Sequence, residues 1–341
     1  MPFIRFSDAG GSRKIIRITN RDHRILVTGA TGVIGAHLIR VLKEKKYLVR
    51  ALTSKPPRLS DPFIEWRQMD WRISLDFDRQ VEGCSAVVHL GVEKRDINIM
   101  PRVNVDATRA LAAAADRAGA RLFCYASSVS VYGSPLTRLV TENSPVVTPE
   151  RDVASEYWAE PFMRAYARSK VASEQFLSQR ENKFRCVVLR PTVVRGQEDI
   201  LALGEWSFLR RLILAGRLTH TVSVEDVVHT IMWFLKDTFD RKNPLTEVEI
   251  YNVTDDRPDS TYAAFFETAF AMTQDSRYRC PPHFPAIVDR LMSWCKYRTL
   301  EPRWPFCLVI YSADKLLSTG YRHVLGAKGA YRKALLEPMN G

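Results

Sequence analysis

The chain has 341 residues, 46% of them hydrophobic and 26% charged, which is enough to bury a full core and leave room for a smaller second lobe. The formal net charge is +12, but the lysines and arginines are spread along the chain and no nucleic-acid-binding module is recognisable, so no nucleic-acid partner is expected. No apolar run approaches the roughly 18–20 residues that cross a bilayer, so no stable membrane insertion is expected.

The N-terminal stretch, residues 1–23, is basic. It carries five lysines and arginines but lacks the apolar core of a signal peptide, and we interpret it as a flexible basic extension. The six cysteines of the chain show neither a C-x-x-C pair nor a zinc-ligand spacing. These features predict reduced cysteines, no metal site and a cytoplasmic location.

Apolar strand-like runs alternate with helical patterns over the first 190 residues. This alternation predicts right-handed crossovers and an α/β fold with a doubly wound parallel sheet. Helices are expected at Val103–Ala118 and Ala165–Gln179. The expected strands are Ile25–Thr28, Leu48–Leu52, Ile64–Met69, Ala86–Leu90, Leu122–Ala126 and Cys186–Leu189.

The pattern loosens after Gly196. Val222–Val227 is typical of a strand that enters a helix, and Glu247–Val253 is typical of a further strand. We therefore expect a Rossmann-like dinucleotide-binding domain over residues 24–196, to which residues 221–255 return. Residues 197–220 and 256–341 are expected to form a smaller, C-terminal substrate-binding lobe.

A glycine-rich turn joins the first expected strand to the first helix, in the stretch Val27-Thr28-Gly29-Ala30-Thr31-Gly32-Val33-Ile34-Gly35. Gly29 permits a tight turn, Gly32 lets the backbone approach a pyrophosphate, and Gly35 lets the helix pack closely on the sheet. The amide hydrogens and the positive end of the helix dipole then face the phosphates. The turn predicts a dinucleotide cofactor.

A phenol and an ammonium lie four residues apart at Tyr166 and Lys170, on one helix face. Interconversion of a carbonyl and an alcohol needs a group that gives or takes the hydroxyl proton, and tyrosine does so only when a dry site and nearby positive charge lower its pKa. Ser128, after the strand that ends at Ala126, could hydrogen-bond the substrate oxygen. A second Y-x-x-x-K copy, Tyr311 to Lys315, has no preceding strand-end serine and is expected at the surface.

These motifs resemble the extended short-chain dehydrogenase/reductases of the NAD-dependent epimerase/dehydratase family. The similarity is close over residues 24–255 and loose beyond them. It implies that Ser128, Tyr166 and Lys170 are catalytic, with Lys170 lowering the pKa of Tyr166 and holding the nicotinamide ribose. We interpret His89 as a strand residue rather than a catalyst. Further matching stretches are Met69-Asp70-Trp71, Val87-Val88-His89-Leu90-Gly91 (V-x-H-L-A in the family), Asn104-Val105-Asp106-Ala107-Thr108, Arg190-Pro191-Thr192-Val193-Val194-Arg195-Gly196 and Tyr251-Asn252-Val253.

The resemblance and the glycine turn together predict a nicotinamide cofactor. An acidic residue after the second strand would accept the ribose hydroxyls, but Thr53, Ser54 and Lys55 stand there instead, and Lys55 or Arg58 could pair with a 2′-phosphate. We therefore expect NADP or NAD, with a modest preference for NADP. The expected cofactor-binding residues are Gly29, Thr31, Gly32, Val33, Ile34, Gly35, Ser54, Asp70, Trp71, Leu90, Gly91, Tyr166, Lys170, Pro191 and Val193.

The substrate remains open between two classes. Resemblance favours a nucleotide-sugar epimerase or reductase, but the chain lacks the acidic pair of sugar dehydratases after Ser128 and the Asn-containing loop that grips a nucleotide diphosphate. Arg195, Arg210, Arg211 and Arg217 could replace that loop or lie on a solvated helix. The aromatic C-terminal lobe equally suits an apolar ketone or a sterol-like alcohol. A non-catalytic dinucleotide-binding regulatory protein is a third interpretation, and a homodimer is left open.

Overall fold

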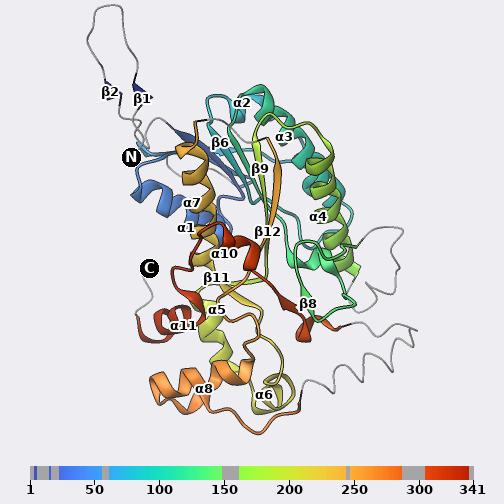
Figure 1. The fold of residues 1–341 in the computed structure, drawn as a ribbon, viewed down its shortest axis with the longest axis vertical. Helices are drawn as coiled ribbons and strands as arrows, with labels where there is room; N and C mark the ends of the chain where they lie inside the picture. Colours follow the sequence, from blue (N-terminus) through green and yellow to red (C-terminus); the bar gives the residue numbers. More distant parts are fainter. Residues whose placement is uncertain are drawn as a thin grey trace, which may run out of the picture.

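A seven-stranded parallel sheet forms the centre of the protein (Figure 1). The computed structural model describes residues 4–5, 15–16, 23–55, 61–147, 161–242, 246–285 and 304–337. The strand order has the crossovers of a doubly wound fold, which confirms the predicted class. From one edge to the other the strands are β12 (Val248–Val253), β9 (Arg185–Pro191), β7 (Leu122–Ala126), β6 (Ala86–His89), β3 (Arg24–Thr28), β4 (Leu48–Thr53) and β5 (Ile64–Gln68).

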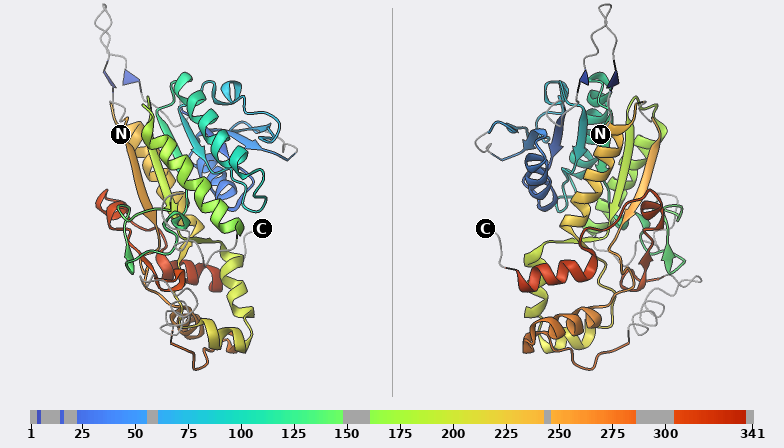
Figure 2. Two further views of the ribbon diagram at one scale, coloured as in Figure 1. Left: turned by 90° about the vertical axis from the view of Figure 1, so that its right-hand side faces the viewer. Right: turned by 60° about the vertical axis from the view of Figure 1, so that its left-hand side comes forward.

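Helices cover both faces of the sheet (Figures 1 and 2). On one face α1 (Val33–Glu44) and α7 (Val224–Asp240) pack side by side, in one apolar cluster with side chains of the strands. The other face carries α2 (Asp78–Val81), α3 (Ala107–Arg117) and α4 (Pro161–Gln179). Apolar residues at helical spacing explain the docking: α1, for example, buries Gly35, Leu38, Ile39 and Leu42.

The segment before α3 departs from the single helix predicted over Val103–Ala118. Pro101–Asp106 forms a π-helix, and the α-helix begins only at Ala107. The wider turn places the Asn104 side chain inward, where it is 2% exposed. Its carbonyl oxygen accepts the N–H of Glu93 at 2.7 Å, and its amide donates to the Ser169 hydroxyl at 2.9 Å. Asn104 thus ties the loop after β6 to α4.

A group of short elements lies beneath the carboxyl ends of the strands (Figure 1). It has its own apolar cluster, which includes Phe265, Phe266 and Tyr331. Its helices are α5 (Gln197–Leu201), α6 (Phe208–Leu214), α8 (Tyr262–Thr273) and α11 (Gly326–Leu336). The short 3-10 helices η5 (Ala202–Glu205) and η6 (Ser276–Tyr278) contribute to the same cluster, whereas η7 (Phe306–Leu308) packs against another cluster, which contains Tyr132 and Tyr311.

Small strand pairs complete the structure. In the parallel pairs, β10 (Val193–Arg195) joins β11 (Thr221–Ser223) and β13 (Ile310–Tyr311) joins β8 (Leu139–Val140). After β13, α10 (Asp314–Ser318) returns to β12, and Leu316 enters the core of the main sheet.

In the expected N-terminal extension, β1 (Ile4–Arg5) pairs antiparallel with β2 (Ile15–Ile16). The other residues of that extension before residue 23 lie outside the described ranges. Within the described ranges, no helix combines the length and apolar character of a membrane span, and no group of three or more His, Cys, Asp or Glu side chains could hold a metal ion.

Candidate active site

The three glycines of the turn between β3 and α1 differ in what surrounds them. Gly29 has φ +63°, and its carbonyl oxygen accepts the N–H of Gly32 at 3.0 Å, which closes the turn. A Cβ on Gly35 would lie only 2.3 Å from the Gly29 carbonyl oxygen, so the close packing of α1 requires that glycine. A Cβ on Gly32 would meet only that same oxygen, at 3.3 Å. Apart from that oxygen, no described part of the chain fills the space beside Gly32.

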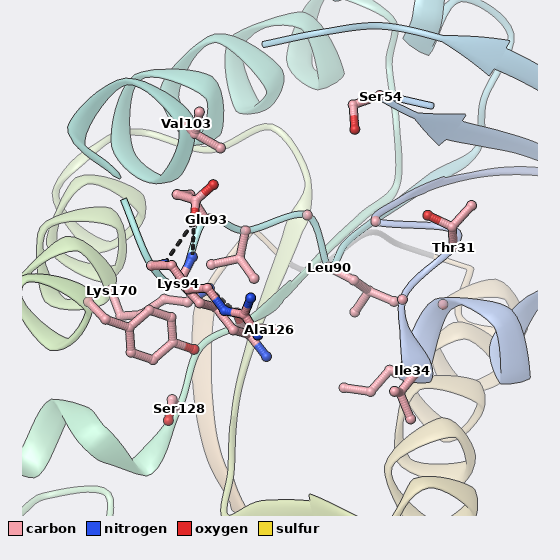
Figure 3. Close-up of a pocket in the computed structure, with 18 of the residues that line it drawn as sticks. Thr31, Ile34, Ser54, Leu90, Glu93, Lys94, Val103, Ala126, Ser128 and Lys170 are labelled. Carbon is pink, nitrogen blue, oxygen red and sulfur yellow. Dashed lines mark hydrogen bonds between the residues drawn. The ribbon is translucent and has the colours of Figure 1, made fainter. Parts of the chain in front are cut away.

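A cavity of about 980 Å³ lies at the carboxyl ends of the strands, where ligands bind in doubly wound folds. Figure 3 shows Ser128 and Lys170 on one side of the cavity and Thr31 and Ile34 on the other. The structure brings all the predicted site residues together around this cavity. They are Gly29, Thr31, Gly32, Val33, Ile34, Gly35, Ser54, Asp70, Trp71, Leu90, Gly91, Ser128, Tyr166, Lys170, Pro191 and Val193.

His89 holds one wall of the cavity through two threonines. The Thr28 hydroxyl oxygen accepts the N–H groups of Leu90 and Gly91, at 3.1 and 3.0 Å, so its proton is free to go to His89 Nδ1, 2.8 Å away. Thr108 donates its hydroxyl proton to a carbonyl, so its oxygen accepts from His89 Nε2 at 2.9 Å. This network assigns a neutral imidazole with its proton on Nε2. Burial lowers the pKa of His89 to about 3, so the imidazole stays neutral, in agreement with a structural role in the strand.

Gly91 is also fixed by packing. A Cβ at this position would lie 2.2 Å from Cη2 of Trp71, so the indole occupies the space of a side chain. The Trp71 ring in turn packs edge-on against Phe77, with ring centres 5.7 Å apart. The indole and the glycine together shape the wall of the cavity between β5 and β6.

The candidate catalytic groups come from α4 and from the end of β7. Lys170 Nζ donates to the Ala126 carbonyl oxygen at 2.6 Å and lies 5.8 Å from the centre of the Tyr166 ring. Ser128 caps the 3-10 helix η3 (Val129–Tyr132), and its hydroxyl oxygen accepts the N–H of Ser130 at 3.1 Å. The Ser128 side chain also acts on Tyr166, because it lowers the pKa of the phenol. The chain therefore assembles a serine, a tyrosine and a lysine within contact range.

The electrostatics of this group differ from the expectation that Lys170 lowers the pKa of Tyr166. Burial raises the pKa of Tyr166 to about 12, and the hydrogen bond from Ser128 offsets only part of that rise. Burial likewise lowers the pKa of Lys170 to about 7, a shift that Glu174 opposes. Desolvation outweighs the neighbouring charge in the protein alone, so the phenol is neutral and able to donate a proton.

The second tyrosine motif was expected at the surface; Lys315 is exposed, but for Tyr311 that prediction was wrong. Tyr311 is 2% exposed and its ring centre lies 5.9 Å from that of Tyr132. Pairing of β13 with β8 carries it into an apolar cluster, an arrangement between distant segments that local sequence does not reveal. Tyr311 does not line the cavity, and Lys315 lies over the ring of Tyr251 instead.

Several lining residues were not predicted from the sequence. Glu93 accepts the N–H groups of Lys94 and Arg95 in one tight loop, each at 2.8 Å, and both basic residues line the cavity. Phe162 and Met163, one turn before Tyr166, add an apolar wall. Their position in the sequence could have indicated them. Glu93 to Arg95 follow the end of a strand, and Phe162 and Met163 precede Tyr166 on the same helix. The remaining unpredicted lining residues are Leu52, Thr53, Met69, Arg72, Val92, Ile99, Val103, Ala126, Ser127, Thr192 and Val194.

Polar groups surround the end of β4. The Asp70 carboxylate accepts a bidentate interaction from Arg72, with Nη2 2.6 Å from Oδ2. The Thr53 hydroxyl oxygen accepts the N–H of Lys55 at 3.1 Å, and Ser54 lines the cavity. Arg58, the other predicted phosphate partner, lies outside the described residues.

Two of the arginines considered for a nucleotide diphosphate are engaged within the chain. Arg195 donates to the hydroxyls of Thr221 and Tyr262, at 3.1 and 2.9 Å. Arg211 is buried and donates to the carbonyl oxygens of Gly204 and Arg279, at 2.8 and 3.0 Å, so it does not lie on a solvated helix face.

Sequence comparison finds reductases among the proteins that are similar to this chain. A putative dihydroflavonol 4-reductase from Synechocystis sp. is 31% identical over 226 residues, which cover 61% of this chain and 62% of that protein. The ceramide reductase of Caulobacter vibrioides is 26% identical, over 62% of this chain and 61% of that protein. The matched part of the chain thus spans about three fifths of the length of these relatives.

Solved structures share the fold. The UDP-glucuronic acid 4-epimerase of Bacillus cereus in complex with NAD has a TM-score of 0.63 at 16% identity, covering 92% of this chain and 96% of that one. The UDP-glucose 4-epimerase of Thermotoga maritima has a TM-score of 0.62 at 17% identity, covering 91% and 97%. The sequence model of the NAD dependent epimerase/dehydratase family matches residues 25–253. The chain therefore belongs to the NAD-dependent epimerase/dehydratase family, as the glycine turn and the Ser128, Tyr166 and Lys170 constellation predict.

Proposed function

We propose that this protein is an NAD(P)-dependent oxidoreductase that interconverts a secondary alcohol and a ketone, with a nucleotide sugar as the first substrate class. One observation carries the proposal: a single cavity joins the glycine turn to Ser128, Tyr166 and Lys170. A dinucleotide fits this arrangement because Gly32 keeps the space beside the helix N-terminus free of side-chain atoms. The intact trio also speaks against a purely regulatory dinucleotide-binding protein.

Each side chain has a separate task in this mechanism. The bound cofactor supplies or accepts the hydride. Tyr166 is the general acid/base, and its neutral phenol is the form that donates a proton to the substrate oxygen during reduction. Ser128 orients that oxygen through its hydroxyl, while Lys170 holds the nicotinamide ribose and supplies positive charge when Tyr166 ionises.

Replacement of Tyr166 tests this assignment. Tyr166→Phe should lower turnover by about two to four orders of magnitude, because general acid/base catalysis contributes that much, while cofactor affinity is retained. Tyr311→Phe is the matched control: within the described residues the buried Tyr311 hydroxyl has no hydrogen-bond partner, so its removal should leave turnover unchanged. If Tyr311→Phe were the more damaging change, the wrong tyrosine would have been chosen.

The nucleotide-sugar class is supported by relatives that include a UDP-glucose 4-epimerase of Vibrio cholerae, 26% identical over half of this chain. A reductase of an apolar ketone is the second candidate. Phe162, Met163 and Ile99 support it because they make one wall of the cavity apolar, and Arg211 is already bound to carbonyl oxygens of its own chain.

Cofactor retention distinguishes the two candidates. An epimerase oxidises and re-reduces one carbon, so its cofactor should remain bound through purification and appear in the ultraviolet spectrum of the denatured protein. A reductase must release its cofactor on every turnover and should be purified largely free of it. Adding both oxidised and reduced cofactor to the purified protein controls for loss by dilution.

Further assignments complete the proposal. Residues 24–196 with 221–255 form the dinucleotide-binding domain, and residues 197–220 and 256–341 form the substrate-binding lobe. The cofactor is NADP in preference to NAD, because the residues at the end of β4, Thr53 to Lys55, offer hydroxyls and an ammonium rather than a carboxylate. The proposed location is cytoplasmic, with the substrate as the expected partner.

A further inference from the structure

A buried ion pair involves a residue of α4 that lies one helical turn after the candidate catalytic lysine. Glu174 follows Lys170 by four residues on α4, which places both side chains on one face of the helix. Arg190, at the end of β9, binds both Glu174 carboxylate oxygens, with Nε 3.1 Å from Oε1 and Nη2 2.5 Å from Oε2. The side chains of Arg190 and Glu174 are only 4% and 5% exposed. The carboxylate is therefore held in one orientation and shielded from water.

The same arginine connects the pair to the rest of the site. Arg190 Nη1 donates to the Tyr132 hydroxyl at 2.8 Å, and that hydroxyl donates to Asn252 Oδ1 at 2.7 Å. Tyr132 ends η3, the 3-10 helix that Ser128 caps, and the residue after Arg190 lines the cavity. A single ion pair thus links four chain segments, and three of them carry residues of the site.

The surroundings of Lys170 explain what a fixed carboxylate does there. Its Nζ lies over the rings of Tyr125 and Tyr166, at 4.6 and 5.8 Å from their centres, and donates to one carbonyl oxygen. Burial and the charge of Lys94 both favour the neutral amine, whereas Glu174 favours the ammonium. His89 is another titratable neighbour of Lys170. It is neutral, because its hydrogen bonds to Thr28 and Thr108 assign a proton to Nε2 only.

We propose that the buried Glu174–Arg190 pair is a positioning group that favours the ammonium form of Lys170 beside Tyr166. The proposal rests on the function proposed above, since it assigns the pair to the ionisation of the same tyrosine. Glu174 touches neither the cavity nor the reacting atoms, so it acts through Lys170. Arg190 holds the carboxylate in place and prevents an uncompensated buried charge.

Titration of Tyr166 in the complex with NAD⁺ tests the proposal without a known substrate. Tyrosinate absorbs in the near ultraviolet, and subtracting the titration of Tyr166→Phe isolates the step of that one residue. Glu174→Gln should raise the midpoint of the step by about one pH unit, a tenfold change in the ionisation constant, because a neutral Lys170 no longer stabilises the phenolate.

Two further variants separate this effect from loss of structure. Glu174→Gln combined with Arg190→Met removes both buried charges and should raise the midpoint in the same direction, without leaving an unpaired guanidinium. Asp116→Asn breaks the ion pair with Arg180, just beyond the end of α4, and should leave the midpoint where it is. An unchanged midpoint in both Glu174 variants would overturn the proposal. A parent protein with no Tyr166 step in the accessible range would instead overturn the proposed function and this inference with it.

Discussion

The neutral state of His89 makes a quantitative prediction about acid stability. In the folded protein its pKa is about 3, whereas an exposed histidine of the unfolded chain titrates near 6.5. As the pH falls below 6.5, His89 binds a proton in the unfolded chain, whereas in the folded protein it does so only near pH 3. The stability that His89 contributes is therefore present above pH 6.5 and is lost as the pH falls. At pH 5 the loss is about 2 kcal/mol, because about 1.5 pH units of unfolded-state protonation are each worth about 1.4 kcal/mol.

Urea unfolding of the parent and of His89→Gln, at pH 7.5 and at pH 5, measures this contribution of His89 to the free energy of unfolding. The free energy of unfolding of the parent should fall by about 2 kcal/mol more than that of the variant. Other buried groups cancel in this comparison because both proteins retain them. Burial lowers the pKa of His220 to about 4, which adds a loss of the same sign, and raises that of Asp255 to about 8, which opposes it.

The matched control is His37→Gln, which removes a histidine of α1 outside this network and should leave the contribution of His89 intact. Equal losses in the parent and in His89→Gln would refute the reasoning, since the network through Thr28 and Thr108 would then not hold the imidazole neutral.

Further predictions concern the glycine turn and the end of β4. Gly32→Val should abolish cofactor binding, measured by titration calorimetry, while its melting temperature stays near that of the parent; unchanged affinity would contradict the ligand role of the turn. Gly35→Ala should instead lower the free energy of unfolding by about 1–3 kcal/mol, because its Cβ would overlap a backbone carbonyl. Combined Lys55→Glu and Arg58→Glu should weaken NADP binding by about tenfold or more and leave NAD binding nearly unchanged, as followed by fluorescence titration. A clear preference of the parent for NAD would show that the end of β4 has been misinterpreted.

The sequence predicts the sheet and the cofactor cradle because their signals are local. The apolar run of each buried strand and the spacing of Gly29, Gly32 and Gly35 depend on neighbouring residues alone. Strand ends were less accurate: β9 extends to Pro191, beyond the expected Leu189, because pairing with β12 continues past the apolar run.

What the sequence does not predict depends on contacts between distant segments. Tyr311 is buried only because β13 reaches β8, and Arg211 is engaged only because the chain near Gly204 and Arg279 lies beside it. The ionisation of Tyr166 is a further case, since the balance between desolvation and neighbouring charge is set by burial, which no short motif specifies.

The contact between Trp71 and Gly91 also has an evolutionary consequence. The family pattern places alanine where this chain has Gly91, and a methyl group there would overlap the indole ring. A side chain at 91 therefore requires the indole to move away or a smaller residue to stand at 71. Homologous sequences should therefore show these two sites covarying, with tryptophan at 71 inherited together with glycine at 91.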